Sequence, residues 1–199
     1  MNYTVKMFAL TALVATGASL LAAPFKDGDV VVFFGDSITH GGRYHEFITD
    51  FYRTRYPDLS VRFINSGVGG DNANAAQRRI PDDVTPYNPT HVAIHFGMND
   101  VSRGSYGADA NINAISRRVD AYEKWKENIN VLLGKLKDVV PNAKHIYFTT
   151  TPYDDAAVVT NIPPGTKGWS TRNNVGCNVG LSMMAGHIAS KAAADKVCY

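Results

Sequence analysis

Three short polar segments of this 199-residue chain carry residue types used in acyl-transfer chemistry. Gly35-Asp36-Ser37 offers the hydroxyl of Ser37 as a nucleophile. The glycine-rich stretch 65–72 offers the backbone N–H of Gly70, and Gly97-Met98-Asn99-Asp100 offers the side-chain amide of Asn99. Preorganised N–H donors of this kind stabilise the negative charge of a tetrahedral intermediate. The three segments together predict a nucleophile and an oxyanion hole.

Each segment, taken alone, has a plainer structural interpretation. Asp36 or Ser37 is a good helix cap, since short polar side chains accept hydrogen bonds from the first turn. The glycines of 65–72 suit an ordinary strand-to-helix loop. Asn99 suits an Asx turn. The prediction therefore depends on the order of the three segments and on the strands that precede them.

Four apolar segments rich in β-branched and aromatic residues predict buried strands that end in loops. They are Val30–Phe34, Val61–Ile64, His91–Phe96 and His145–Thr149. Strands that alternate with helices form a mostly parallel sheet, and ligands bind at the carboxyl ends of such strands. The three polar segments follow the first three strands, so they are expected to meet at one edge of the sheet.

Helical periodicity fills the intervals between these strands. One predicted helix face follows the first strand, a long amphipathic helix precedes the fourth strand and ends before Pro141-Asn142, and a last helix covers Val179–Lys196. The first face comprises Tyr44, Phe47, Ile48, Phe51 and Tyr52. The apolar face of the long helix comprises Ile112, Ile115, Val119, Tyr122, Ile129, Leu132, Leu133 and Leu136.

The ordered set of segments resembles the SGNH hydrolase family, also called GDSL-type esterases. The resemblance extends over most of the chain from Val30 to Pro152 and rests on Gly35-Asp36-Ser37, on Asn65 with Gly67–Gly70, and on Gly97–Asp100. It implies an α/β fold, a three-layer flavodoxin-like sandwich with a mostly parallel sheet. It also implies a serine hydrolase that cleaves carboxylic esters without a cofactor or metal.

The resemblance assigns roles to particular residues. Ser37 is expected to be the nucleophile, and the oxyanion hole is expected to consist of the Ser37 and Gly70 backbone N–H groups and the Asn99 side chain. Asp36, His40 and Asp154 lie on or beside the loops that follow the strands and are predicted to contact substrate. For Asp36 and Asp154, capping of a helix or turn is the alternative.

One family feature is missing from the sequence. The family carries its Asp and His in an Asp-x-x-His pattern on a late loop, and no such pattern occurs here. None of the six histidines has the expected context, and a serine needs an adjacent base to be an effective nucleophile. Either the chain is a fragment, incomplete at its C-terminus, or it is a non-catalytic relative that binds carbohydrate or another ligand. The fragment is the favoured interpretation, and it predicts poor stability and negligible esterase activity for residues 1–199 alone.

The first residues have the composition of a secretory signal peptide. Lys6 is followed by a short apolar run and by small residues ending at Ala22-Ala23. We therefore expect a signal peptide at residues 1–23, one esterase domain over 24–199, and a secreted or periplasmic protein. The alternative is an uncleaved anchor or a buried helix. The run is short for a membrane span, so no stable membrane insertion is expected after cleavage.

Composition and sequence motifs narrow the classes of partner that are expected. The chain has 20 Lys and Arg against 18 Asp and Glu, and no basic stripe, so nucleic acid is not an expected partner. Neither phosphate-binding glycine fingerprint is present. Cys177 and Cys198 could pair in an exported protein, and no zinc-type spacing occurs. A small-molecule or carbohydrate ester with a short acyl group is the expected substrate, with Tyr106, Tyr153 and Trp169 either stacking on a sugar or packing locally.

Overall fold

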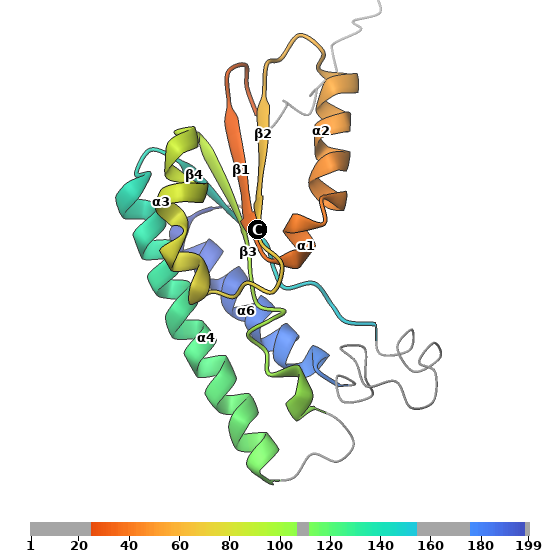
Figure 1. The fold of residues 1–199 in the computed structure, drawn as a ribbon, viewed down its shortest axis with the longest axis vertical. Helices are drawn as coiled ribbons and strands as arrows, with labels where there is room; N and C mark the ends of the chain where they lie inside the picture. The colour runs from red at the N-terminus through yellow and green to blue at the C-terminus, as the bar shows by residue number, and fades with distance from the viewer. Residues whose placement is uncertain (1–24, 107–111, 155–175, 198–199) are drawn as a thin grey trace, which may run out of the picture.

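A computed structural model of the chain describes residues 25–106, 112–154 and 176–197. These residues form an α/β fold around a four-stranded, wholly parallel sheet with strand order β2-β1-β3-β4 (Figure 1). All four predicted strands are confirmed, with ends shifted by a few residues. Their bounds are Val30–Gly35 for β1, Arg62–Gly67 for β2, His91–His95 for β3 and Lys144–Tyr147 for β4.

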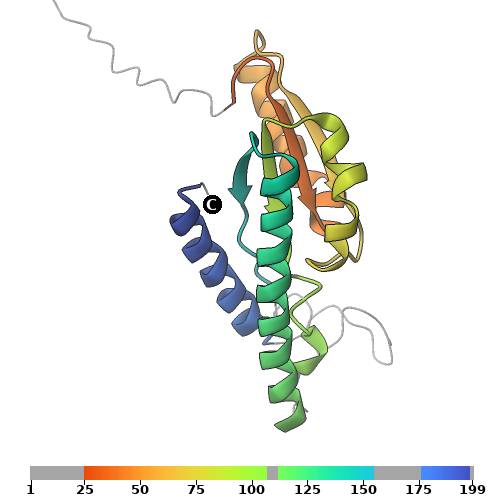
Figure 2. The same ribbon diagram turned by 90° about the vertical axis from the view of Figure 1, so that its left-hand side faces the viewer.

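Helices cover both faces of the sheet and give the three layers expected from the sequence (Figures 1 and 2). α1 (Ser37–His40) and α2 (Arg43–Arg55) lie on one side. The other side carries α3 (Ile80–Asp83), α4 (Ile112–Val139) and α6 (Asn178–Asp195). Three short 3-10 helices complete the connections: η1 (Ala75–Arg78), η2 (Thr85–Tyr87) and η3 (Arg103–Ser105).

Strand β1 shows why the sheet must be covered on both faces. Successive side chains of a strand point to opposite faces. Val32 and Phe34 are fully buried in the core beneath α4 and α6. Val31 and Phe33 are buried in a second core that includes Tyr52 of α2. Every residue on this strand after Val30 is buried, as the unbroken apolar run predicted.

The predicted apolar face of α2 is partly wrong. Tyr44, Ile48 and Tyr52, four residues apart, pack against the core. Phe47 is 74% exposed and Phe51 is 49% exposed. The inward stripe is narrower than predicted because one row of side chains at four-residue spacing, with the buried His45 beside it, already covers this face of the sheet.

The predicted face of α4 is confirmed only in its second half. Ile129, Leu132, Leu133 and Leu136 are buried. The residues of the first turns, Ile112, Ile115 and Val119, are exposed, which corrects their placement in the core. Figure 1 gives the reason, since the first turns of α4 extend beyond the end of the sheet, where no strand lies beneath them.

The register of the sheet brings the three polar segments level with one another. Gly35, the last residue of β1, pairs with Gly67 of β2 on one side and with His95 of β3 on the other. The strands are parallel, so the loops that follow them leave the same edge of the sheet from neighbouring positions. This edge is where the sequence predicted the site.

The predicted signal peptide, residues 1–23, lies outside the described residues, and so does Cys198. Cys177 is buried at the start of α6, and its pairing with Cys198 stays a prediction. Within the described ranges, no helix combines the length and apolar character that crossing a membrane requires.

Candidate active site

Ser37 lies on the first turn of α1, directly after β1, and its side chain is exposed. Asp36 caps this helix by accepting a hydrogen bond from the Ile38 backbone N–H at 2.9 Å. Asp36 is only 1% exposed, so capping is the role that the structure shows, and its contact with substrate stays a prediction. The strand-to-helix turn therefore presents the Ser37 hydroxyl outward while Asp36 fixes the helix start.

The end of β2 packs tightly against α1. A Cβ atom at Gly67 would collide with the backbone of Thr39 and His40, so this position requires glycine. His40 is exposed, and its Nδ1–H donates to the Gly67 carbonyl oxygen at 3.1 Å. Asn65 Nδ2 in turn donates to the His40 carbonyl oxygen at 3.2 Å. His40 thus joins α1 to β2, and its predicted contact with substrate is not tested by these bonds.

The loop after β2 folds back over the end of β1. The Val68 N–H donates to the Gly35 carbonyl oxygen at 3.0 Å, and the Asp71 N–H donates to the Val68 carbonyl oxygen at 3.2 Å. Gly70 is exposed with φ +78°, a backbone conformation that favours glycine. Among the backbone hydrogen bonds of the described loops, none is donated by Ser37 or Gly70. Both N–H groups are therefore available to a ligand.

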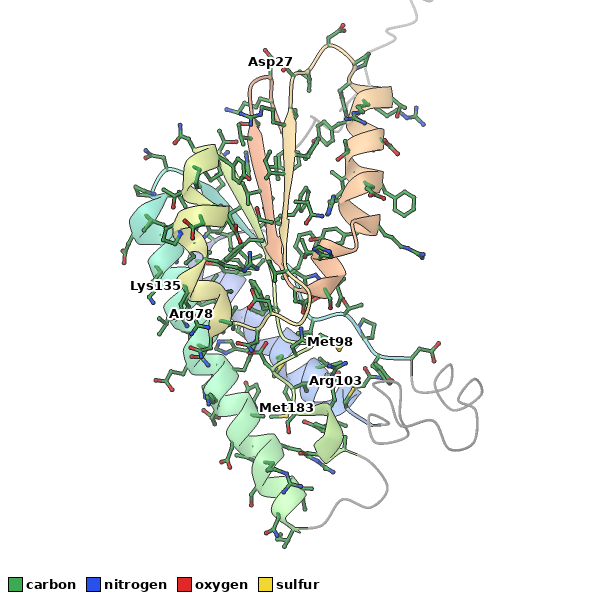
Figure 3. All side chains as sticks on the ribbon, viewed as in Figure 1. Asp27, Arg78, Met98, Arg103, Lys135 and Met183 are labelled. Atoms are coloured by element: carbon green, nitrogen blue, oxygen red, sulfur yellow. The ribbon has the colours of Figure 1, made fainter. Side chains whose placement is uncertain are left out.

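Asn99 lies beside the Gly70 loop. Its Nδ2 donates one hydrogen bond to the Asp71 carbonyl oxygen at 2.7 Å, which leaves the second amide hydrogen for a ligand. Its Oδ1 accepts a long hydrogen bond, 3.4 Å, from Nη2 of Arg103, which Figure 3 shows on the segment after β3. The structure thus links Asn99 to the loop of Gly70, and that loop to the strand that precedes Ser37.

Three carboxyl groups surround these donors, those of Asp36, Asp71 and Asp100. Burial raises the pKa of Asp100 to about 7, and the nearby charges of Asp36 and Asp71 add to this effect. The Ala73 N–H donates to Asp100 Oδ1 at 3.2 Å and partly opposes it. Burial also raises the pKa of Asp36, with Asp71 contributing repulsion. Within the described ranges, no group of His, Cys, Asp or Glu side chains has an arrangement that could hold a metal ion.

Arg79 crosses beneath the loops and was missed by sequence reasoning. It forms a short ion pair with Asp71, 2.6 Å between Nε and Oδ2, and a second with Asp83 of α3 at 2.8 Å. Asp100 and Arg103 were also missed as site residues. The only available signal was their position in or just after a post-strand loop, since contacts to backbone oxygens leave no pattern in the sequence.

All six histidines lie in the described part of the chain, and no hydrogen bond there joins one of them to Ser37. His45 donates to the Thr39 carbonyl, His91 contacts Thr90, and His95 contacts Thr151. Burial lowers the pKa of His95 and that of His145 to about 4, so both stay neutral near neutral pH. The three strand histidines, His91, His95 and His145, are buried in the core, and one ring nitrogen each of His95 and His145 has no hydrogen-bond partner among the described residues.

Four further residues were predicted to contact substrate or to stack on a sugar, and the structure describes three of them. Asp154 is exposed on the segment that follows β4, and its role in substrate binding stays a prediction. Tyr106 and Tyr153 are partly buried against the main core, which supports local packing over sugar stacking. The guanidinium of Arg118 also lies 4.6 Å from the Tyr106 ring centroid. Trp169 lies outside the described residues.

Solved structures of esterases share this fold. An acetylxylan esterase from Geobacillus stearothermophilus superposes with a TM-score of 0.62 at 19% identity, covering 86% of this chain and 75% of that chain. Three related structures are catalytic mutants of that esterase in which a serine, an aspartate or a histidine is replaced by alanine. A gut microbial diltiazem-metabolizing enzyme superposes with a TM-score of 0.71 at 30% identity.

Sequence comparison leads to the same group of proteins. The curated acetylxylan esterase from Geobacillus stearothermophilus is 31% identical over 91 residues, 38% of this chain. That match spans 42% of the esterase, and the structural match spans 87% of this chain but 36% of the diltiazem-metabolizing enzyme, so the chain spans only part of the length of these relatives. The model of the GDSL-like Lipase/Acylhydrolase family matches residues 33–199. This model covers most of the chain, and the chain therefore belongs to the GDSL-like lipase/acylhydrolase family.

Proposed function

We propose that this chain provides the nucleophile and the oxyanion hole of a serine hydrolase that cleaves short-chain acyl esters, with acetyl esters of carbohydrates as the substrate class. The observation that carries the proposal is the arrangement of the three post-strand loops. Ser37 is exposed and follows β1, and the loops of Gly70 and Asn99 follow the neighbouring strands at the same level of the sheet. A 2.7 Å hydrogen bond joins Asn99 to the Gly70 loop.

The reaction follows from these positions. Ser37 Oγ attacks the ester carbonyl carbon and loses its proton to a base, and the carbonyl oxygen becomes an anion that accepts hydrogen bonds from the Ser37 and Gly70 N–H groups and the Asn99 amide. The bond to the alcohol then breaks, the alcohol leaves with a proton, and an acyl group stays on Ser37. Water attacks this acyl-serine, and the acid is released.

The substrate class is supported by the relatives. The curated and solved relatives include an acetylxylan esterase, whose name gives acetylxylan as its substrate. A short acyl group also fits an exposed serine on an open loop edge. Export by the signal peptide of residues 1–23 would bring the protein to extracellular polysaccharide. Mass spectrometry of the exported protein tests this point, and a mature N-terminus that still includes Met1 would contradict it.

A binding function is the second candidate, and one observation favours it. No described histidine is hydrogen bonded to Ser37, and the sequence has no Asp-x-x-His. A serine without a base is a weak nucleophile. A chain with this site and no base would bind a carbohydrate or another ligand without turning it over.

An experiment with 4-nitrophenyl acetate separates the two candidates. We expect residues 1–199 to hydrolyse this activated ester very slowly, because the serine lacks a base. Added imidazole can act as that base, so it should accelerate the transfer of one acetyl group to the protein, detected by intact-mass spectrometry and mapped to Ser37. A fluorophosphonate should label the same residue.

Two variants provide the controls. Ser37→Ala should abolish both modifications, while Ser182→Ala, at an exposed serine of α6, should leave them unchanged. Acetylation that is insensitive to Ser37→Ala would refute the proposed nucleophile. Binding of acetylated xylo-oligosaccharides with no modification of Ser37 would establish the binding function instead.

A further inference from the structure

The guanidinium group of Arg79 lies under the candidate site and is held by backbone and side-chain oxygens. Its Nη2 donates to the Gly35 carbonyl oxygen at 2.7 Å, and its Nη1 donates to the Ser66 carbonyl oxygen, also at 2.7 Å. Gly35 is the last residue of β1, and Ser66 is the last but one of β2. Nε donates to the Asp71 carboxylate at 2.6 Å. One side chain therefore joins two strand ends and the loop that carries Gly70.

The plane of this guanidinium is fixed from other directions as well. Nη1 also donates to Asp83 Oδ2 in α3 at 2.8 Å. The central carbon lies 4.3 Å from the centroid of the Phe34 ring, so the group stacks on the sheet. Four of its five N–H donors are thus used, and the side chain is only 15% exposed. Such a group has little freedom to move.

Each donor of the proposed oxyanion hole is connected to Arg79 through a residue that Arg79 binds. Gly35, whose carbonyl Arg79 binds, precedes Ser37 by two residues. Asp71, whose carboxylate Arg79 binds, follows Gly70 directly. The carbonyl oxygen of the same Asp71 accepts the side-chain amide of Asn99. A displacement of Arg79 would therefore move all three donors at once.

We propose that Arg79 is a positioning residue that sets the geometry of the oxyanion hole by holding the ends of β1 and β2 and the Asp71 loop in one arrangement. The proposal rests on the function proposed above. Arginine suits this task because its planar fork of donors reaches several oxygens in fixed directions, whereas the lysine ammonium is a single flexible point charge. A lysine at this position keeps the positive charge but lacks the planar set of N–H donors.

A purely structural role makes a different prediction. If Arg79 only stabilised the fold through its ion pairs, its replacement would lower stability but leave the rate of a folded variant unchanged. If Arg79 positions the donors, the maximal rate of Ser37 acetylation falls in a folded variant, since a misplacement of about 1 Å can cost about a hundredfold in rate. The ester concentration at half-maximal rate should then change little.

The test compares Arg79→Lys with Arg78→Lys in the full chain. Arg78 is the adjacent residue in η1 and is exposed, so it is a matched control (Figure 3). The first readout is the rate of Ser37 acetylation by 4-nitrophenyl acetate with imidazole present. The second is the hydrogen exchange of the Val68 and Asp71 backbone amides, which donate to the carbonyl oxygens of Gly35 and Val68 and do not depend on catalysis.

We expect Arg79→Lys to lower the maximal acetylation rate about a hundredfold. It should also speed exchange at Val68 and Asp71 while the strand amides of β1 stay protected, and Arg78→Lys should do neither. Should Arg79→Lys fail to fold, Asp71→Asn replaces it, because this variant weakens the 2.6 Å ion pair and keeps the carbonyl that binds Asn99. It should show the same two effects at smaller size.

Unchanged acetylation in a folded Arg79→Lys or Asp71→Asn variant would overturn the proposal, whether or not the loop exchanges faster. Slower acetylation without faster loop exchange would also overturn it, since the rate would then fall by another route. If the wild-type chain is not acetylated at Ser37, the proposed function fails. Faster loop exchange in Arg79→Lys alone would still show in that case that Arg79 holds the loop.

Discussion

Asp100 should make the stability of this protein depend on pH in an unusual direction. Its carboxyl group lies close to Asp36 and Asp71, and burial raises its pKa from 3.8 to about 7. The folded protein therefore holds the Asp100 proton more tightly than the unfolded chain does. Replacement by Asn retains an acceptor for the Ala73 N–H and resembles the protonated carboxyl group, but it has no charge to lose.

The sign and size follow from linkage. Below pH 3.8, Asp100 is protonated in both the folded and the unfolded protein, and its contribution to stability is fully present. That contribution is lost as the pH rises through about 7, where the buried group must ionise. A pKa raised from 3.8 to about 7 corresponds to about 4 kcal/mol, at about 1.4 kcal/mol per unit of pKa. This value is the upper limit for Asp100→Asn, since surrounding groups can relax.

Urea unfolding of wild type and Asp100→Asn between pH 4 and pH 8 measures this effect. The difference in unfolding free energy should grow in favour of the variant as the pH rises. Comparing the two proteins cancels the opposite contribution of the buried histidines, whose low pKa values destabilise the fold in acid. Asp138→Asn, at an exposed position of α4, removes the same charge and should show no such trend. A constant difference for Asp100→Asn across this range would refute the reasoning.

Two further predictions concern packing and an ion pair. Gly67→Ala should destabilise the fold by about 1–3 kcal/mol, because the added Cβ collides with α1. Gly69 has open space around it, so Gly69→Ala should change stability by less than about 0.5 kcal/mol. Equal urea midpoints for the two variants would contradict this prediction. Burial opposes ionisation of Asp195, but hydrogen bonds from Lys137 and Tyr147 hold its pKa at about 2. Asp195→Asn should therefore destabilise the fold at pH 7, and this loss of unfolding free energy should shrink as the pH falls below about 4. Unfolding curves at pH 3, 5 and 7 would reveal or exclude the trend.

Local pattern was enough to predict the sheet and the edge at which the candidate site residues lie. The strand at Val30–Phe34 is an unbroken apolar run with both faces buried, and the alternation of strands with helices predicted that the sheet is parallel. Ser37, Gly70 and Asn99 each follow such a strand, and the register places their loops side by side. Residues whose role depends on the strand they follow can be read from the sequence.

Residues whose role depends on contacts across the fold could not be read in this way. Arg79 lies in a short stretch between η1 and α3, next to another arginine that is exposed. Nothing in the order Arg78-Arg79 tells which of the two reaches the carbonyl oxygens of Gly35 and Ser66. These acceptors are backbone atoms, which every residue has, so the pairing leaves no trace in side-chain type.

The predicted apolar faces of α2 and α4 were partly wrong for a related reason. Periodicity shows which side chains share a face, but it does not show how far the sheet extends beneath them. Phe47 and Ile112 both have the correct spacing for burial. The first is exposed because a neighbouring row of α2 already covers the sheet, and the second because α4 is longer than the strands it packs on.

The charges around the proposed oxyanion hole give the ionisation of Asp100 a further consequence. Three carboxylates, those of Asp36, Asp71 and Asp100, would oppose a developing negative charge, and two guanidinium groups, those of Arg79 and Arg103, offset them. Arg79 is also paired with Asp83, and ionisation of Asp100 adds one further negative charge to this group. Because the pKa of Asp100 is about 7, the protonated, less negative state is favoured below neutral pH. Asn at position 100 fixes that less negative state at every pH, so the variant that tests stability also isolates the electrostatic contribution of this proton to the site.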